Sequence, residues 1–305
     1  MAMTFSVTIL GCGSATPSLK HFTSAQIVNV RDKLFLVDCG DGTQIQLRGC
    51  RLPFGGINNI FISHLHGDHC FGLMGVISSF GLLGRTAPLF VYAPKEFEHI
   101  FKEMLDFFCT DFPFEVVFNG FDAKKQEVIY DDRSVSVTTI PLKHRVPCAG
   151  FLFKEKPVED HIDRAMCDYY KVPQWDYARI KQGGDFTLDD GTVIPHERLT
   201  KPAEKPRSYA YCCDTAYNPA MIGQISGVDA VYHDCTYSQT DESKADLYYH
   251  STTVQAATIA RKANAGKLIL GHFSAKYQDE NQLIEEALQV FPNTVLAKEK
   301  NTIDL

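Results

Sequence analysis

The stretch SHLHGDHC, residues 63–70, holds four side chains that can bind a metal ion. His64 and His66 are two positions apart, so an extended backbone places both imidazoles on one side. Asp68 and His69 follow after a glycine that lets the chain turn. Imidazole and carboxylate groups are common zinc ligands, and four of them in six positions are seldom incidental. The cluster therefore predicts a metal site.

A tetrahedral zinc ion has four ligands, and side chains this close together in sequence cannot all serve one ion. A natural division gives His64 and His66 to one ion and Asp68 and His69 to a second. Each ion then needs ligands from elsewhere in the chain. Three candidates directly follow apolar runs: His144 in TTIPLKHR, Asp214 in SYAYCCDT and His272 in KLILGHFS. Taken alone, each also has an ordinary interpretation, as a loop histidine, a turn aspartate or a partly buried histidine.

Strands and turns must bring these candidates together. Short apolar runs rich in β-branched residues are typical of strands, and longer amphipathic runs are typical of helices. The expected strands are 5–11, 26–30, 33–38, 58–63, 89–93, 115–119, 126–130, 134–140, 208–213, 230–234, 267–272 and 294–298. The expected helices are 43–50, 69–83, 95–108, 218–226, 252–264 and 279–290. This order predicts an α/β sandwich in which helices cover two packed sheets.

Residues 155–207 interrupt the pattern. They contain five prolines and three glycines, show little hydrophobic periodicity, and nearly balance acidic with basic residues. A long, weakly patterned segment inside a domain is usually a functional protrusion or a disordered insert.

The composition limits the class of protein. The chain has 305 residues, of which 45% are hydrophobic and 22% charged, enough for one large globular domain or two small ones. No apolar stretch approaches the length of a membrane span. The start, MAMTFSVTIL, has no basic n-region and no small-residue cleavage site, so we expect no secretory signal. The ten cysteines form no C-x-x-C pair. Free thiols without an export signal predict a reducing cytoplasm. The net charge of −7 argues weakly against a nucleic-acid partner, although local patches matter more than the total.

The motif GCGSATP at 11–17 also suggests a dinucleotide-binding turn. It lacks the third glycine of that fingerprint, and the stretch that follows is typical of a loop and a strand rather than a helix. We therefore favour a tight turn near the metal site over a nicotinamide or flavin site.

Several stretches together resemble one family. The pattern H-x-H-x-D-H with a later His, Asp and His is similar to the ligand set of the metallo-β-lactamase superfamily. Further stretches resemble its ribonuclease Z (tRNA 3′-endonuclease) branch: GCGSATPS at 11–18, LVDCGDGTQIQL at 36–47, PLKHRVPCAGF at 141–151, HDCTY at 233–237, YYHSTT at 248–253 and LGHFSAKY at 270–277. The resemblance covers nearly the whole chain. It implies a single domain over 1–305 with a four-layer αββα sandwich.

The resemblance also implies two zinc ions, although manganese or iron suits the same ligands. One ion would be held by His64, His66 and His144, and the other by Asp68, His69 and His272. Asp214 would bridge them. Two such metals can activate a shared water, so the implied reaction is attack of a metal hydroxide on a phosphodiester of precursor tRNA, which releases the 3′ trailer. Asp68 could also orient or deprotonate that water.

The leaving 3′ oxygen needs a proton, and His250 in YYHSTTVQAATIARKA is the candidate donor. Thr252 and Gln255 have the spacing of a capping box, which would fix the start of the next helix beside it. A histidine that merely adjoins a cap is the alternative. Asp234 in HDCTY is the candidate partner that holds the His250 ring, at a position where the family more often carries glutamate.

Three functions compete on these observations. The first is an endoribonuclease that trims precursor tRNA, and the second is a zinc phosphodiesterase or other small-ester hydrolase of the same fold. The third, a non-catalytic metal-stabilised protein, does not explain the complete ligand set and His250. In the family an arm between the third and fourth ligand motifs grips tRNA, which implies this role for 155–207, although Val-Pro-Gln-Trp replaces the usual glycine–proline turn. Trp175 could stack on RNA or pin the arm to a core. The resemblance further implies a homodimer.

Overall fold

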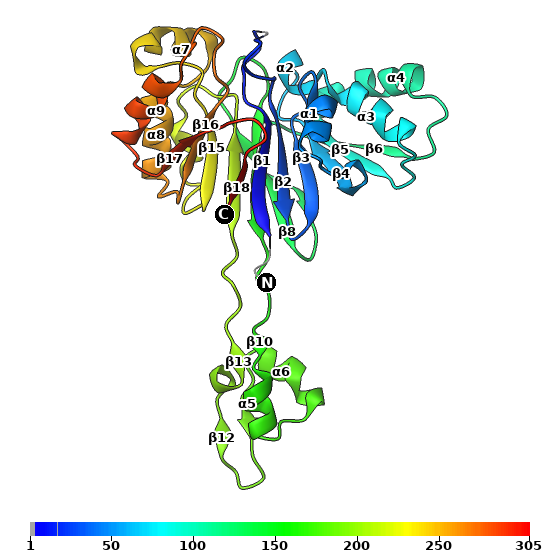
Figure 1. The fold of residues 1–305 in the computed structure, drawn as a ribbon, viewed down its shortest axis with the longest axis vertical. Coiled ribbons are helices and arrows are strands. Elements are labelled where there is room, and N and C mark those ends of the chain that lie inside the picture. The colour runs from blue at the N-terminus through cyan, green and yellow to red at the C-terminus, as the bar shows by residue number, and fades with distance from the viewer. Residues whose placement is uncertain (1–3, 17) are drawn as a thin grey trace. The chain divides into compact units, whose positions relative to one another are not determined.

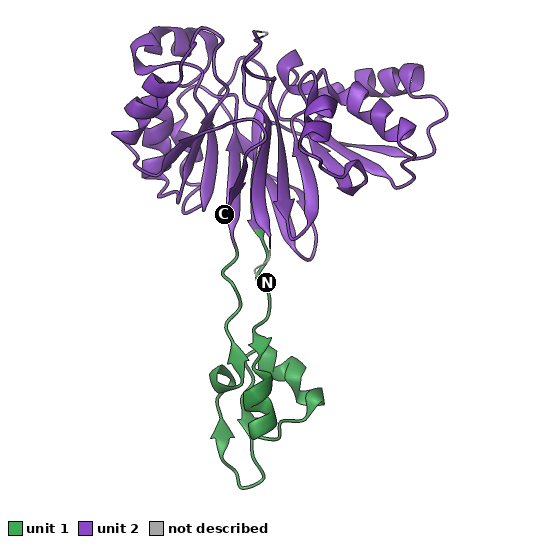
Figure 2. Cartoon of the chain, in the orientation of Figure 1, with its two compact units in different colours: residues 1–2, 155–206 green, residues 3–154, 207–305 purple. Residues whose placement is uncertain are grey.

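The computed structural model describes residues 4–16 and 18–305, so the first residues of the chain and Pro17 of the 11–18 motif lie outside the described ranges. The chain divides into two compact units (Figure 2). Unit 1 contains residues 155–206, and unit 2 contains the described residues before and after that segment.

Unit 2 is built on two sheets. The first has the strand order β18-β1-β2-β3-β4-β5-β6. Its strands are β18 (Thr302–Asp304), β1 (Phe5–Gly11), β2 (Ala25–Val30), β3 (Lys33–Val37), β4 (Ile57–Phe61), β5 (Leu89–Pro94) and β6 (Val116–Phe121). The pairs from β3 to β6 are parallel, and those from β18 to β3 are antiparallel.

The second sheet has the order β17-β16-β15-β14-β9-β8-β7. Its strands are β17 (Thr294–Leu296), β16 (Leu268–Gly271), β15 (Ala230–Asp234), β14 (Ser208–Cys212), β9 (Ala149–Glu155), β8 (Val135–Pro141) and β7 (Val128–Asp131). Strands β14 to β17 are parallel, so their carboxyl ends lie at one edge of the sheet. Candidate ligands follow two of these ends, after β14 and after β16.

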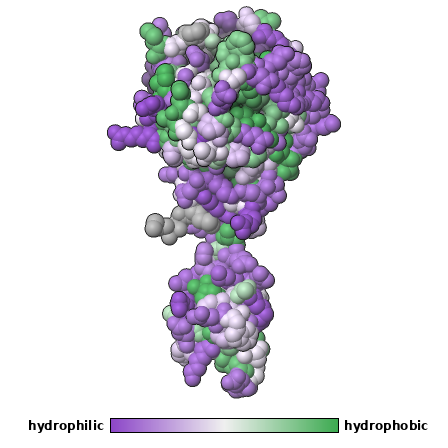
Figure 3. All heavy atoms as spheres, turned by 90° about the vertical axis from the view of Figure 1, so that its right-hand side faces the viewer, coloured by the Kyte–Doolittle hydropathy of each residue, from purple (hydrophilic) through white to green (hydrophobic). Residues whose placement is uncertain are grey.

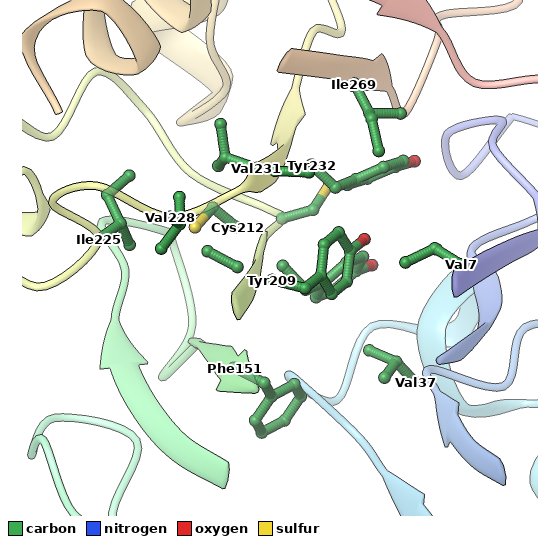
Figure 4. Packing of buried hydrophobic residues seen from close by; sticks show 14 of the residues in the cluster. Val7, Val37, Phe151, Tyr209, Cys212, Ile225, Val228, Val231, Tyr232 and Ile269 are labelled. Carbon is green, nitrogen blue, oxygen red and sulfur yellow. The ribbon is translucent and has the colours of Figure 1, made fainter. Parts of the chain in front are cut away.

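Alternating side chains of the strands separate the two faces of the first sheet. In β3, Phe35 and Val37 pack into the core between the sheets, whereas Leu34 and Leu36 pack under the helices. Figure 4 shows Val7 and Val37 on the side of the core facing Tyr209 of the second sheet. This alternation follows from the two-residue period of a strand.

Helices cover the outer face of each sheet (Figure 1). The first sheet is covered by α1 (Thr43–Gly49), α3 (Leu73–Leu82) and α4 (Glu98–Phe108), and the second by α8 (Thr253–Lys262) and α9 (Asn281–Leu288). The shorter helices α2 (Gly67–Cys70) and α7 (Glu242–Tyr248) lie in the connections. The expected αββα sandwich is therefore confirmed. No helix in the described ranges is long and apolar enough to cross a membrane.

Two expected helices were wrong in extent. The helix expected over 69–83 is two helices, α2 and α3, because the His69 carbonyl and the Gly72 N–H bond to the backbone of Cys39 instead of continuing one helix. The expected helix 218–226 is only a 3-10 turn over Pro219–Met221. Helix α7 and the strands β9 and β18 were not predicted.

Unit 1 has its own small core. It contains the helices α5 (Arg164–Tyr169) and α6 (Tyr177–Lys181) and the strand pairs β10 (His161–Ile162) with β13 (Thr200–Lys201) and β11 (Phe186–Thr187) with β12 (Val193–Ile194). The buried apolar residues are Cys167, Val172, Ile180, Ile194 and Leu199. The weak periodicity of the sequence thus reflects very short elements. Trp175 is 80% exposed and does not serve as an anchor in this core.

The outer surface near α3 and α4 combines polar and apolar side chains (Figure 3). The exposed apolar residues include Leu82, Leu83, Phe107 and Phe108, at the carboxyl ends of these two neighbouring helices.

Candidate metal centre

Strand ends position the seven predicted ligands in unit 2. His64 and His66 follow β4, and Asp68 and His69 lie on the short helix α2. The other three follow strands of the second sheet: His144 after β8, Asp214 after β14 and His272 after β16. The structure brings all seven together. Most of them are buried, including His64 and His69, which are fully enclosed.

The first group consists of His64, His66, His144 and Asp214, whose potential ligand atoms all lie within 4.8 Å of one another. The Nδ1 atom of His66 is 3.1 Å from His64 Nε2 and 3.2 Å from His144 Nε2. Asp214 presents Oδ2 to this group, at 3.7 Å from His64 Nε2 and 3.8 Å from His144 Nε2.

The second group consists of Asp68, His69, His272 and the same Asp214. Asp214 presents its other oxygen, Oδ1, at 3.3 Å from His69 Nε2 and 3.1 Å from His272 Nε2. Asp68 Oδ2 is 3.4 Å from His69 Nε2 and 3.3 Å from His272 Nε2. The two oxygens of Asp214 therefore face the two groups, one each.

In four of the histidines, a hydrogen bond to Nδ1, on the side of the ring away from the cluster, fixes the orientation of the ring. His69 Nδ1 donates to Asp38 Oδ2 at 2.7 Å, and His144 Nδ1 donates to the Tyr249 carbonyl at 2.9 Å. A carboxylate oxygen and a carbonyl oxygen accept these bonds, so each ring carries a hydrogen on Nδ1 and turns Nε2 toward the centre.

Two hydroxyls do the same for the remaining pair. Ser63 Oγ donates to Asp38 and Thr236 Oγ1 donates to Asp234, so each hydroxyl accepts a hydrogen bond from a ring N–H. Their partners are His64 Nδ1 at 3.0 Å and His272 Nδ1 at 2.8 Å. The Nε2 atoms of both rings again face the centre.

Burial and charge hold the two groups in different states. Burial and the neighbouring imidazoles lower the pKa of His64, His66 and His144, so these rings are neutral near pH 7. Burial raises the pKa of Asp214, but the rings of His272 and His69 outweigh this effect and hold it well below its usual range. In the first group, neutral imidazoles beside an ionised carboxylate are the protonation states that a metal requires. In the second group, burial lowers the pKa of His69, but the carboxylates of Asp214, Asp38 and Asp68 outweigh burial and raise it well above its usual range, so this ring must release a proton when a metal binds.

His250 lies beside the centre, between α7 and α8. Its Nδ1 is 2.8 Å from Asp234 Oδ2, so the shorter aspartate does reach the ring. Burial lowers the pKa of His250, but the Asp234 carboxylate outweighs burial and raises it to about 9. The predicted capping box of Thr252 and Gln255 is present at the start of α8.

A cavity of about 360 Å³ opens onto these residues. Its lining includes His66, Asp68, His144, Asp214, His250 and His272, together with Ser14, Ala15 and Thr16 of the GCGSATP turn. These residues of the turn therefore lie near the metal site, as predicted.

A ribonuclease Z from Bacteroides fragilis is 54% identical to this chain over 301 residues, which is 99% of either chain. The chain belongs to the ribonuclease Z family.

Solved structures agree on the fold of this ribonuclease Z family member. Human tRNase Z, short form, is 24% identical, with a TM-score of 0.71 over 98% of both chains. The metallo-β-lactamase fold protein YhfI from Bacillus subtilis is 18% identical, with a TM-score of 0.71 over 99% of this chain and 100% of its own. Residues 5–158 also match the family of the anti-Pycsar protein Apyc1, and this range ends before Asp214 and His272.

The residues of this ribonuclease Z family member fit divalent metal ions. Five ring nitrogens and two carboxylates converge, and the described residues offer no hydrogen bond to the buried Nε2 of His69. Nitrogen and oxygen ligands of this kind suit zinc, manganese or iron. A divalent cation would satisfy lone pairs that otherwise face one another.

Sequence reasoning missed Asp38 as part of the site. Its carboxylate accepts hydrogen bonds from the Ser63 backbone N–H, the Ser63 and Tyr211 hydroxyls, and His69. The only signal in the sequence was its place in LVDCGDGTQIQL, a stretch that resembles the family. Its contacts to Tyr211 and His69 cross long sequence distances, so spacing alone does not reveal them.

Proposed function

We propose that this protein is a metal-dependent endoribonuclease that removes the 3′ trailer from precursor tRNA. The observation that carries the proposal is the family membership at 54% identity together with seven converging ligand-type residues. We assign His64, His66 and His144 to one zinc ion, Asp68, His69 and His272 to a second, and Asp214 to both. Manganese or iron would suit the same atoms.

The residues around the cavity would divide the reaction among them. A pair of divalent ions there would lower the pKa of a shared water and neutralise charge on the phosphoryl oxygens. Asp68 lines the cavity, and we assign it to orient the attacking water. His250 lines the cavity as well, and we assign it to donate a proton to the leaving 3′ oxygen. Asp234 holds the His250 ring by its 2.8 Å contact to Nδ1, which leaves Nε2 for the substrate.

The arm, residues 155–207, is proposed as the tRNA-binding exosite. Trp175 and Tyr169 are 80% and 76% exposed, and aromatic rings of this kind stack on unpaired bases or ribose. We further propose a cytoplasmic homodimer in which the exposed apolar side chains at the ends of α3 and α4 contribute to the contact.

The test is to incubate zinc-loaded protein with a precursor tRNA and to map the cut by end-labelled sequencing. The expected product is a tRNA without its 3′ trailer. An Asp214→Ala variant provides the inactive control. A protein that leaves the precursor intact but hydrolyses a small activated phosphodiester would support the small-ester hydrolase instead.

A further inference from the structure

A second cluster of ligand-type side chains lies outside the seven catalytic candidates. Cys12, His21 and Glu299 place their side-chain atoms within 4.8 Å of one another, although up to 287 positions separate them in sequence. The Cys12 thiol is fully buried, and the side chains of His21 and Glu299 are 13% and 14% exposed.

The atoms of this cluster have nearly the spacing of a tetrahedral zinc shell. His21 Nδ1 is 3.5 Å from Cys12 Sγ and 3.0 Å from Glu299 Oε1. Ligands that lie about 2.0–2.3 Å from a tetrahedral zinc ion are about 3.3–3.6 Å apart. Small side-chain shifts would therefore complete the geometry.

The far side of the imidazole also fits a metal ligand. His21 Nε2 is 3.2 Å from Glu280 Oε1, and Lys20 pairs with the same carboxylate. Histidines that bind zinc usually donate their other N–H to a carboxylate, which fixes the ring and raises its basicity. The backbone N–H of Phe22 donates to Glu299 Oε1 at 3.2 Å and orients that carboxylate.

We propose that Cys12, His21 and Glu299 bind a third zinc ion with a structural role, with Glu280 orienting His21 and a water molecule as the fourth ligand. A thiolate, an imidazole and a carboxylate are all zinc ligands, and the sulfur favours zinc over magnesium or calcium. Binding releases the thiol proton of Cys12 to solvent.

This ion would stabilise one wall of the catalytic cavity. The Phe273 N–H donates to the Cys12 carbonyl at 2.9 Å, and the Ser14 N–H donates to the Phe273 carbonyl at 3.0 Å. The rings of His21 and Phe273 are 5.6 Å apart. Phe273 directly follows the candidate ligand His272, and Ser14 lines the cavity. The Cys12 backbone therefore connects the third site to His272 and to Ser14 through Phe273.

A protonated His21 held between Glu280 and Glu299 is the competing explanation. It accounts for the two carboxylates, and it leaves the Cys12 thiol protonated, donating to the Ala297 carbonyl at 3.6 Å. The two explanations differ in whether a metal–sulfur bond forms.

Cobalt substitution separates them. The catalytic candidates offer only nitrogen and oxygen, so a thiolate-to-cobalt charge-transfer band in the near ultraviolet reports a metal–sulfur bond. We expect this band in the full-length cobalt-loaded protein, with an intensity that saturates at one site per chain. Zinc-loaded protein should show sulfur scattering at about 2.3 Å in X-ray absorption.

Variants show which cysteine supplies the sulfur that binds the metal. Cys12→Ser should abolish the band and lower the metal content by one ion per chain, and His21→Gln should weaken it. Cys213→Ala is the matched control, because Cys213 lies beside Asp214 with its sulfur 2.8 Å from Oδ1. A band that survives Cys12→Ser, or that Cys213→Ala removes, would overturn the proposal. Absence of the band from the wild-type protein would also overturn the proposal, and this outcome does not depend on whether any variant folds.

Discussion

Replacing Asp38 with asparagine should weaken the metal centre without removing any direct ligand. In Asp38→Asn, Oδ1 can keep the bond from the Ser63 N–H, but an amide NH2 replaces the oxygen that faces His69 Nδ1 at 2.7 Å. The Ser63 and Tyr211 hydroxyls, at 2.9 Å and 2.7 Å, can turn and accept hydrogen bonds from this NH2. His69 can accept only if its proton moves to Nε2.

That shift would direct an N–H at the centre. His69 Nε2 already lies 3.3 Å from Asp214 Oδ1, so the moved proton would find an acceptor and the nitrogen would no longer bind a metal. Loss of such an outer partner costs about 10- to 100-fold in metal affinity. This corresponds to about 1.4–2.8 kcal/mol of binding free energy.

The assay is zinc affinity, measured by competition with a chromophoric chelator, together with precursor-tRNA cleavage at fixed free zinc. Asp41→Asn, an exposed aspartate three positions away, is the control and should match the wild type. Far-UV circular dichroism should show that both variants fold. If folded Asp38→Asn binds both ions as tightly as the wild type, Asp38 does not set the tautomer of His69.

Three further outcomes follow from the same centre and from unit 1. Asp214→Ala should lose most of both catalytic ions by elemental analysis, because its two oxygens face both groups; a variant that keeps two ions and full activity would refute the bridging assignment. His250→Ala should slow RNA cleavage by about 10²–10⁴ at unchanged metal content, and a substrate whose leaving group needs no proton should be much less affected. Equal losses on both substrates would exclude proton donation. Replacing residues 157–205 with a Gly-Ser linker removes all of the unit 1 core, so it should reduce precursor-tRNA cleavage by orders of magnitude while hydrolysis of a small phosphodiester persists. Equal losses there would mean that the arm supports the fold or the dimer.

The sequence pattern predicted those parts of the fold that depend on residues close together in the sequence. A continuous apolar run, such as LFLV in KLFLVD, is typical of a strand with two buried faces, and the structure has β3 there. His64 to His69 could be recognised because the ligand-type residues are adjacent in sequence. His144, Asp214 and His272 were found by their position after strands, and parallel pairing from β14 to β16 explains why the last two meet.

Features that depend on distant residues were not predicted. The break between α2 and α3 comes from backbone hydrogen bonds of His69 and Gly72 to Cys39, which no helical periodicity records. The cluster of Cys12, His21 and Glu299 joins the two ends of the chain, and its cysteine looked like one free thiol among ten. The core of unit 1 depends on elements of two to six residues, too short to give a hydrophobic period.

The two sheets contribute opposite halves of the metal centre: His64 follows β4 of the first sheet, whereas Asp214 and His272 follow strands of the second. Ions that bind only when the sheets are packed add to the free energy of unfolding, by about 4 kcal/mol for each site at a thousandfold excess over its dissociation constant. Thermal stability should therefore depend on the free metal concentration. Bound zinc would therefore let the protein tolerate destabilising substitutions. A core substitution that lowers the free energy of unfolding by about 2 kcal/mol could have no effect in metal-replete cells and be harmful under zinc starvation.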